Sequence, residues 1–305
     1  MMSGEGRNAL VVGVDGSLAS RQATMWAARE AVRRRAALEL VIGYQVSVGF
    51  AGPGRVIPPD FIHVVETYAE EVISDCRNRI AGSFPELEVT THVRPGHAAV
   101  VVCEAGRYAL MTVVGSHGHS AVKEVLLGSV ALKVAAGAGG PVVVVRGQEP
   151  TAGSEAGPVW VGIDGSAQSE RAVAFAFEEA SIRNAPLVAI HTWNDNSSEN
   201  LFGHFEIERD AALFEEQRRL AAEQMSGWTQ KYPDVAVRSL VLRGAPAATL
   251  LGHAQAPVPG AEPALIVVGS RGRGGFAGLL LGSVSQALIT HAHCPVAVVK
   301  NDSPK

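Results

Sequence analysis

Features of membrane-spanning, secreted and disulfide-bonded proteins are scarce in this sequence. No apolar run approaches the roughly 20 residues that a membrane-spanning helix needs. The N-terminal residues show no positive segment followed by an apolar stretch and a cleavage site. Only three cysteines occur, widely spaced along the chain: Cys76, Cys103 and Cys294. This usage argues against a disulfide framework and fits a reducing compartment. We therefore expect a soluble protein of the cytoplasm.

An excess of positive charge is also missing. The formal net charge is −4, from 26 Lys and Arg against 30 Asp and Glu. The long-range field that draws proteins onto a polyphosphate backbone is therefore not expected, and we predict neither a nucleic acid nor a membrane as a partner. The 47% hydrophobic and 18% charged residues are typical of a globular protein, and 305 residues suffice for two domains with separate cores.

The chain contains an internal repeat. VGVDGS, around Asp15, recurs as VGIDGS around Asp164, 149 residues later. TVVGSHGHSAVKEVLLGSV at residues 112–130 recurs as IVVGSRGRGGFAGLLLGSV at 266–284, 154 residues later. A stretch rich in Gly, Pro, Ser and Glu separates the copies, and we place a linker at 148–157. The sequence thus predicts two domains of one kind, at residues 1–147 and 158–305.

Short runs of Val, Ile and Leu alternate with longer segments of helical spacing in each copy. The runs are apolar on both faces, as expected for parallel strands covered by helices on each side. Each copy is therefore predicted to be a five-stranded, doubly wound α/β domain. Sheets of this kind bind ligands beyond the carboxyl ends of their strands, where the order of connection reverses.

One long amphipathic helix is expected in each copy, from Pro58 to Ile80 and from Glu206 to Trp228. A Gly/Pro-rich or Asn/Ser-rich loop precedes each helix. A lid over a ligand and a docking surface for a partner are both open interpretations of these loops.

Glycines recur with one spacing after the fourth strand of each copy. The pattern Gly-x2-Gly-x9-Gly-Ser occurs at Gly115, Gly118, Gly128 and Ser129, and again at Gly269, Gly272, Gly282 and Ser283. Glycine lets the backbone approach an anion closely and adopt positive φ, and a serine at a helix start can cap the helix or bind phosphate. If the pattern occurred in one copy only, a tight turn followed by an ordinary helix cap would be enough to explain it. Recurrence of every spacing favours a backbone-mediated anion site in both copies.

The two glycine loops differ in their basic residues. Copy two has Arg271 and Arg273 where copy one has His117 and His119. Arginine offers a permanent charge and a fork of donors to phosphate, whereas histidine is mostly uncharged near neutral pH. We therefore expect weaker anion binding in copy one.

Other types of site have less support. The lysine of a P-loop, the Rossmann glycine pattern and the last glycine of a nucleophile elbow are all missing. Two histidine pairs, His117/His119 and His291/His293, contain metal-ligating residue types, the second pair together with Cys294. The first pair lies in the glycine loop, and the second precedes a buried strand in which Cys294 is interpreted as a core residue. We predict neither a metal site nor a catalytic residue.

These motifs resemble the universal stress protein family in its tandem-domain, ATP-binding form, which is common in actinobacteria. The resemblance rests on the glycine spacing, the two VG[VI]DGS strands and the ending HAHCPVAVV, and it covers residues 8–146 and 158–300. It implies an α/β sandwich of the adenine nucleotide alpha hydrolase type. In that family the glycine motif binds the phosphates and ribose of ATP. Whether magnesium accompanies the ATP is left open.

The resemblance assigns site residues in both copies. In copy one the phosphate site falls on Gly115, Ser116, His117, Gly118, His119, Gly128, Ser129 and Val130. In copy two it falls on Gly269, Ser270, Arg271, Gly272, Arg273, Gly282, Ser283 and Val284. The base and ribose side is assigned to Gly13 and Asp15 in copy one and to Gly162 and Asp164 in copy two, where Asp195 is a further candidate to accept a ribose hydroxyl.

Three functions follow from these sites. The first is an ATP-binding regulator of stress or growth that performs no fast catalysis. The second is a slow ATPase or phosphotransferase in which Asp15 and Asp164 orient a metal or a water. The third is a nucleotide-free interaction scaffold, against which the intact spacing counts. The resemblance further implies pairing through the last strand of each copy, hence an internal pseudo-dimer, a homodimer of whole chains and an unidentified regulatory protein partner.

Overall fold

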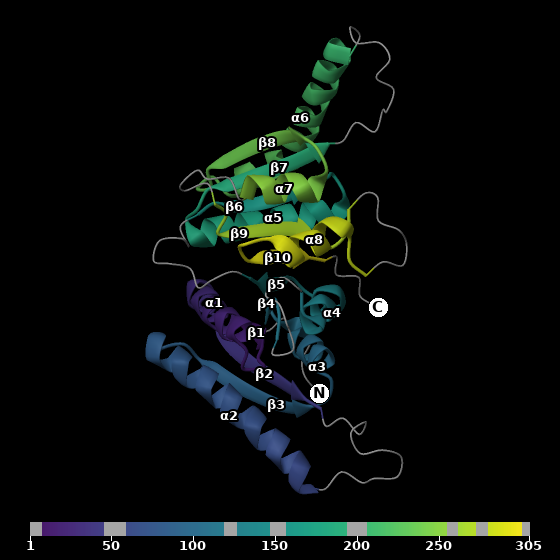
Figure 1. Cartoon of the computed structure of the whole chain (residues 1–305). Coiled ribbons are helices and arrows are strands. Elements are labelled where there is room, and N and C mark those ends of the chain that lie inside the picture. Colours follow the sequence, from purple (N-terminus) through teal and green to yellow (C-terminus); the bar gives the residue numbers. More distant parts are fainter. Residues whose placement is uncertain are drawn as a thin grey trace, which may run out of the picture. The chain divides into compact units, whose positions relative to one another are not determined.

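The chain divides into two compact units, Met1–Gln148 and Glu149–Lys305 (Figure 1). The computed structural model describes residues 8–45, 59–118, 127–146, 157–193, 206–254, 262–272 and 280–300. All but the last residue of the predicted linker, 148–157, lies outside these ranges.

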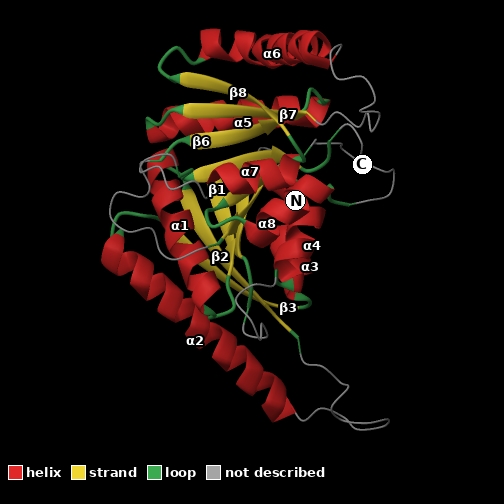
Figure 2. Cartoon of the chain, turned by 45° about the horizontal axis from the view of Figure 1, so that its top comes forward, coloured by secondary structure: helices red, strands yellow, loops and turns green. Residues whose placement is uncertain are grey.

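Unit 1 has a five-stranded parallel sheet with helices on both faces. Its strands are β1 (Ala9–Gly13), β2 (Ala37–Tyr44), β3 (Val89–Pro95), β4 (Met111–Gly115) and β5 (Val142–Val145), in the order β3-β2-β1-β4-β5. Its helices are α1 (Leu18–Arg34), α2 (Pro59–Ser83), α3 (Ala98–Ala105) and α4 (Ser129–Gly137), with a 3-10 turn at Gly106–Tyr108. Helices α1 and α2 contact each other, as do α3 and α4, and the two pairs cover opposite faces of the sheet (Figure 2).

Unit 2 repeats this arrangement. Its strands are β6 (Val159–Ile163), β7 (Leu187–Trp193), β8 (Val237–Arg243), β9 (Leu265–Gly269) and β10 (Val296–Val299), in the order β8-β7-β6-β9-β10. Its helices are α5 (Ala167–Arg183), α6 (Glu206–Lys231), α7 (Pro246–Ala254) and α8 (Ser283–His291). The predicted fold class, two tandem five-stranded parallel α/β domains, is confirmed.

The apolar runs form the strands because both of their faces are covered. Leu10, Val11 and Val12 of β1 are fully buried, and so are Val142, Val143 and Val144 of β5. Covered strands of this kind read as continuous runs of Val, Ile and Leu with no alternation. The cores of the two units therefore lie between each sheet and its two helical layers.

The first helix of each unit begins and ends with the same local devices. Ser17 and Ser166 are the N-caps, and each side chain accepts a hydrogen bond of 3.2 Å from the backbone N–H three residues later. Arg35 and Asn184 end the helices in the left-handed region, with φ of 52° and 50°. The two copies therefore share their backbone geometry at residues with different side chains.

The long amphipathic helices are present as α2 and α6. They extend to Ser83 and Lys231, three residues beyond each predicted end. None of the helices in the described part of the chain combines the length and apolar character needed to cross a membrane.

The order of connection reverses beside the first strand of each unit. Strand β1 pairs with β2 on one side and with β4 on the other, and β6 pairs in the same way with β7 and β9. The carboxyl ends of β1 and β4, and of β6 and β9, are therefore neighbours. Loops that leave two adjacent strands in opposite directions open a crevice between them.

Candidate functional site

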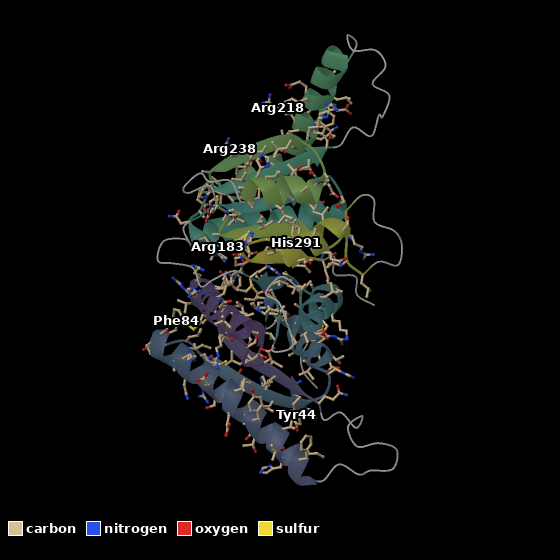
Figure 3. All side chains as sticks on the ribbon, in the orientation of Figure 1. Tyr44, Phe84, Arg183, Arg218, Arg238 and His291 are labelled. Atoms are coloured by element: carbon tan, nitrogen blue, oxygen red, sulfur yellow. The ribbon has the colours of Figure 1, made fainter. Side chains whose placement is uncertain are left out.

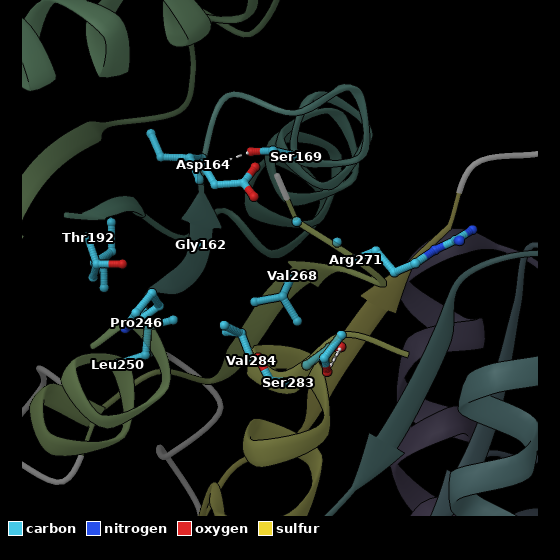
Figure 4. Close-up of a pocket in the computed structure, with 16 residues that line it drawn as sticks. Gly162, Asp164, Ser169, Thr192, Pro246, Leu250, Val268, Arg271, Ser283 and Val284 are labelled. Carbon is cyan, nitrogen blue, oxygen red and sulfur yellow. Dashed lines mark hydrogen bonds between the residues drawn. The ribbon is translucent and has the colours of Figure 1, made fainter. Parts of the chain in front are cut away.

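Each unit has a cavity at this reversal point. The cavity of unit 1 has a volume of about 560 Å³ and that of unit 2 about 500 Å³. Both volumes lie within the range of roughly 300–1,000 Å³ that is usual for small-molecule sites. Figure 4 shows the unit 2 cavity between the end of β6, the start of α7 and the start of α8.

The two cavities are lined by equivalent positions of the repeat. The predicted residues on the wall of the unit 1 cavity are Gly13, Asp15, Gly115, His117, Gly118, Gly128, Ser129 and Val130. Those on the wall of the unit 2 cavity are Gly162, Asp164, Gly269, Arg271, Gly272, Gly282, Ser283 and Val284. The structure thus brings together residues that lie up to 117 positions apart in unit 1, from 13 to 130, and up to 122 in unit 2, from 162 to 284.

Two of the remaining predicted residues, Ser116 and Ser270, do not line these walls. Ser116 and Ser270 are buried, with 1% and 3% of their surfaces exposed, and neither side chain is among the lining residues. His119, Arg273 and Asp195 lie outside the described residues.

A tight turn after the first strand holds an aspartate at the cavity of each unit. The Asp15 carboxylate accepts the N–H of Ser17 through Oδ1 at 2.9 Å, and the Asp15 N–H donates to the Ser20 hydroxyl at 3.1 Å. Asp164 makes the same two bonds, to Ser166 at 2.9 Å and to Ser169 at 3.1 Å, and Figure 4 shows the second of them. The carboxylate is therefore oriented by its own turn before any ligand arrives.

The second oxygen of each aspartate faces the glycine loop. A Cβ atom added to Gly118 would collide with Asp15 Oδ2, and one added to Gly272 would collide with Asp164 Oδ2. The third glycine closes the loop, because the N–H of Gly128 donates to the Ser116 carbonyl at 2.7 Å and the N–H of Gly282 to the Ser270 carbonyl at 2.7 Å. Glycine at these positions keeps the loop close to the aspartate.

The expectation of positive φ in the glycine loops is wrong for their described residues. Positive φ occurs at Gly16 and Gly165 in the aspartate turns, and at Gly96 and Gly244 ahead of α3 and α7. The loop glycines are required for close approach instead. A Cβ atom on Gly115 would lie 2.6 Å from the backbone carbon of Ala19, where α1 packs on the end of β4.

Glycines are the N-caps of α4 and α8, so the cap role is excluded for Ser129 and Ser283 and the role of phosphate ligand is left. Gly128 and Gly282 occupy the cap positions and supply no side-chain hydrogen bond, while Ser129 and Ser283 are the first helical residues. The first N–H groups of each helix are therefore left for another acceptor, at the positive end of the helix dipole. An anion at this position would satisfy them.

The basic residues of the two loops sit differently at their cavities. His117 is half-buried, and its Nδ1 atom lies 2.9 Å from the Ser116 hydroxyl. Arg271 is exposed, and Figure 4 draws its guanidinium pointing away from Gly162 and Asp164. Figure 3 draws many histidine and arginine side chains around the sheets. Among the described residues, only His117 and Arg271 are basic residues on the cavity walls.

Several lining residues were missed by the sequence argument. They are Ser20, Gly43, Ala98, Val102, Val114 and Ala131 in unit 1, and Ser169, Thr192, Pro246, Leu250, Val268 and Ser285 in unit 2. The repeat in the sequence could have revealed them. Each unit 1 residue is separated from its unit 2 equivalent by the offset of the repeated segment in which the two lie. The offset is 149 for Ser20 and Ser169, 148 for Ala98 and Pro246, and 154 for Val114 and Val268.

A different hydroxyl holds the loop in each unit. In unit 2 the buried Ser285 hydroxyl donates to the carbonyls of Ser270 (3.1 Å) and Gly282 (2.9 Å). Unit 1 has Ala131 at that position, and the Ser17 hydroxyl donates instead to the carbonyl of His117 at 3.3 Å. The equivalent loops are thus held by hydroxyls at the starts of different helices, α1 in unit 1 and α8 in unit 2.

The histidines and cysteine near the end of unit 2 do not form a metal cluster. Among the described residues, no group of three or more His, Cys, Asp and Glu side chains is placed to hold a metal ion. His291 and His293 are exposed, and Cys294, expected in the core, is only half-buried as a residue. Burial of its thiol nevertheless raises the pKa of Cys294 to about 12, so the sulfur is a neutral thiol near neutral pH.

Together the fold and the cavities define a tandem α/β protein with one glycine-lined cavity in each unit. The family model described as universal stress protein family matches residues 6–146 and 156–300. The chain therefore belongs to the universal stress protein family, with two family domains in tandem.

Individual relatives agree with this assignment. The chain is 40% identical over 298 residues to a universal stress protein of Mycolicibacterium smegmatis, covering 95% of this chain and 96% of that protein. It is 34% identical over 306 residues to Universal stress protein Rv2623 of Mycobacterium tuberculosis, covering 98% and 99% of the two chains. A solved universal stress protein from Archaeoglobus fulgidus has the same fold, with a TM-score of 0.69, 20% identity, and coverage of 96% of this chain and 98% of that chain.

Proposed function

We propose that each unit binds ATP in its glycine-lined cavity and that the protein acts as a nucleotide-dependent regulator without fast catalysis. The observation that carries the proposal is the recurrence of one cavity at the same structural position in both units, lined by residue pairs at equivalent positions of the repeat. A duplicated fold would keep its cores without keeping a cavity, since an unused cavity is free to fill with side chains.

One end of each cavity suits a polyphosphate. The N-termini of α4 and α8 lack side-chain caps, and the loop glycines allow the backbone to approach an anion closely. The hydroxyls of Ser129 and Ser283 lie at these helix ends on exposed residues. Arg271 adds a permanent charge in unit 2 that His117 does not match in unit 1.

The other end of each cavity suits a base. Its wall includes aliphatic side chains in both units, Val102 and Val114 in unit 1 and Leu250 and Val268 in unit 2. An apolar wall with few polar groups is typical of sites for flat heterocycles. The aspartates line the same cavities, and a carboxylate can accept the ribose hydroxyls.

Magnesium fits the same arrangement. This ion prefers oxygen ligands and is usually held by one or two carboxylates together with substrate phosphates. Asp15 and Asp164 would supply that carboxylate, because Oδ2 of each faces the glycine loop. When bound, the ion would neutralise phosphate charge.

A slow ATPase is the second candidate function. It is favoured by the same orientation of Oδ2, from which an aspartate could orient a water toward the phosphates. We rank it second because Oδ1 of both aspartates accepts an N–H of the turn, a structural role that explains the residue without catalysis.

The resemblance adds proposals about location and assembly. We propose a cytoplasmic protein that pairs through β5 and β10, the last strands of their sheets, giving an internal pseudo-dimer and a homodimer of chains. Pairing would protect Val-rich strand edges from aggregation. A regulatory protein partner would respond to nucleotide occupancy.

Nucleotide content of the purified protein tests the proposal. Released nucleotide is identified by chromatography in the parent and in a Gly118→Val, Gly272→Val double variant, whose new side chains would meet Asp15 and Asp164. A Gly82→Val, Gly227→Val double variant is the matched control, since a Cβ at either helical position meets nothing within 4 Å.

We expect ATP with the parent and the control and none with the loop variant. Loss of ATP from the control as well would point to unfolding, which circular dichroism would report. A parent that neither carries nor takes up ATP contradicts the proposal and supports the scaffold function.

A further inference from the structure

The cavities of the two units differ at the end away from the glycine loop. Three lining positions there carry Gly43, Ala98 and Val102 in unit 1 but Thr192, Pro246 and Leu250 in unit 2. The loop glycines at the opposite end are the same in both units. The two copies therefore differ at the end of the cavity that would hold the part of a ligand farthest from the glycine loop.

Unit 1 has no room for a side chain at position 43. A Cβ atom on Gly43 would lie 2.8 Å from the Ala98 Cα atom and 3.2 Å from the Val101 Cβ atom, because the start of α3 packs against the end of β2. The obstacle is backbone and cannot rotate away. Among the described residues, Gly43, Ala98 and Val102 offer only main-chain atoms and aliphatic carbons to the wall here.

Unit 2 carries a hydroxyl at the equivalent point. Thr192 is half-buried at the end of β7, and Figure 4 shows it across the cavity from Arg271, beside Pro246 and Leu250. Within the described part of the chain its hydroxyl has no hydrogen-bond partner. Proline lacks an N–H and leucine has no polar atom, so neither neighbouring side chain can pair with this hydroxyl.

We infer that Thr192 recognises the exocyclic amino group of an adenine base and makes unit 2 more selective for that base than unit 1. The inference rests on the proposed function, because the phosphates must occupy the glycine loop. The ring edge that carries the amino group is then the part of ATP farthest from the loop. Threonine can accept a hydrogen bond from it. A ligand without a partner group would displace water from the hydroxyl and not replace the bond.

Binding is measured one site at a time in the full chain. The Gly118→Val chain leaves the unit 2 site, and the Gly272→Val chain leaves the unit 1 site. Each is titrated calorimetrically with ATP and with purine riboside triphosphate, which lacks the 6-amino group. At the unit 2 site we expect ATP to bind about fivefold to tenfold more tightly than the analogue, the size of one hydrogen bond. We expect a smaller ratio at the unit 1 site.

Substitutions at Thr192 assign the preference to its hydroxyl. Thr192→Val keeps the shape of the side chain and should reduce the ratio at the unit 2 site to that at the unit 1 site, by weakening ATP and not the analogue. Thr192→Ser keeps the hydroxyl and should restore the preference. An unchanged ratio in Thr192→Val, or equal ratios in the Gly118→Val and Gly272→Val chains, overturns the inference while leaving ATP binding intact. Failure of both compounds to bind at either site contradicts the proposed function itself.

Discussion

Single residues in the cavities are explained by the space around them. Gly118 and Gly272 face Asp15 and Asp164 so closely that no other residue fits without displacing the carboxylate. The aspartates in turn are held by the N–H groups of Ser17 and Ser166. The glycine loop and the aspartate turn therefore form one preorganised wall. A substitution in the loop should displace the aspartate, a substitution in the turn should displace the loop, and either should change the affinity for nucleotide.

Cys294 gives a prediction that depends on pH. Because burial raises the pKa of its thiol to about 12, little thiolate exists at pH 8, and thiolate is the form that reacts with iodoacetamide. The alkylation rate of Cys294, followed by peptide mass spectrometry, should rise steadily from pH 8 to pH 10 without levelling off. A plateau near the usual thiol pKa of about 8.5 would contradict this account.

The raised pKa of Cys294 also makes the free energy of unfolding depend on pH. The unfolded chain releases the thiol proton near pH 8.5, whereas the folded chain keeps it up to about pH 12. Above pH 8.5 the unfolded state therefore binds fewer protons. The contribution of Cys294 to the free energy of unfolding is complete below that pH and declines as the pH rises toward 12.

At the scale of elements, the cavity is made by close packing of helix starts against strand ends. The start of α1 packs on Gly115 of β4, and the start of α3 packs on Gly43 of β2. Such contacts fix the walls of the cavity. The loop between β9 and α8 has an additional link, the hydroxyl of Ser285.

Removal of that link gives an element-scale prediction. Ser285→Ala makes unit 2 resemble unit 1, where Ala131 stands, and should loosen the bond from the Gly282 N–H to the Ser270 carbonyl. Loss of one hydrogen bond of about 1 kcal/mol predicts hydrogen exchange about fivefold faster at that amide. Peptides around Gly128 in unit 1 serve as the internal control. Exchange that stays at the parent rate in Ser285→Ala would show that the hydroxyl does not hold the loop.

The sequence was informative about elements and less so about their exact contacts. Val-rich runs and the repeat predicted the strands, the sheet class and the long helices, because burial on both faces leaves a plain pattern. The serines considered as possible caps of α4 and α8 lie one residue beyond the cap, because the glycine before each serine adopts the cap conformation. Thr192 and Leu250 were missed because crossovers bring them to the cavity from segments without a motif.

At the scale of the whole molecule, the internal repeat gives one chain two related cavities. The loop glycines and aspartates are shared, while the basic residue, the loop hydroxyl and the distal wall have diverged. We therefore expect both units to bind nucleotide but with different affinities, the weaker in unit 1, where His117 stands in place of Arg271.

The number of ATP molecules bound per chain tests the central claim most directly. Native mass spectrometry of the full chain with ATP should show two bound nucleotides, one in Gly118→Val, one in Gly272→Val, and none when both substitutions are combined. The Gly82→Val, Gly227→Val control should keep two. A parent chain that binds no ATP, or a double loop variant that still binds two, would contradict the claim that the glycine-lined cavities are the nucleotide sites.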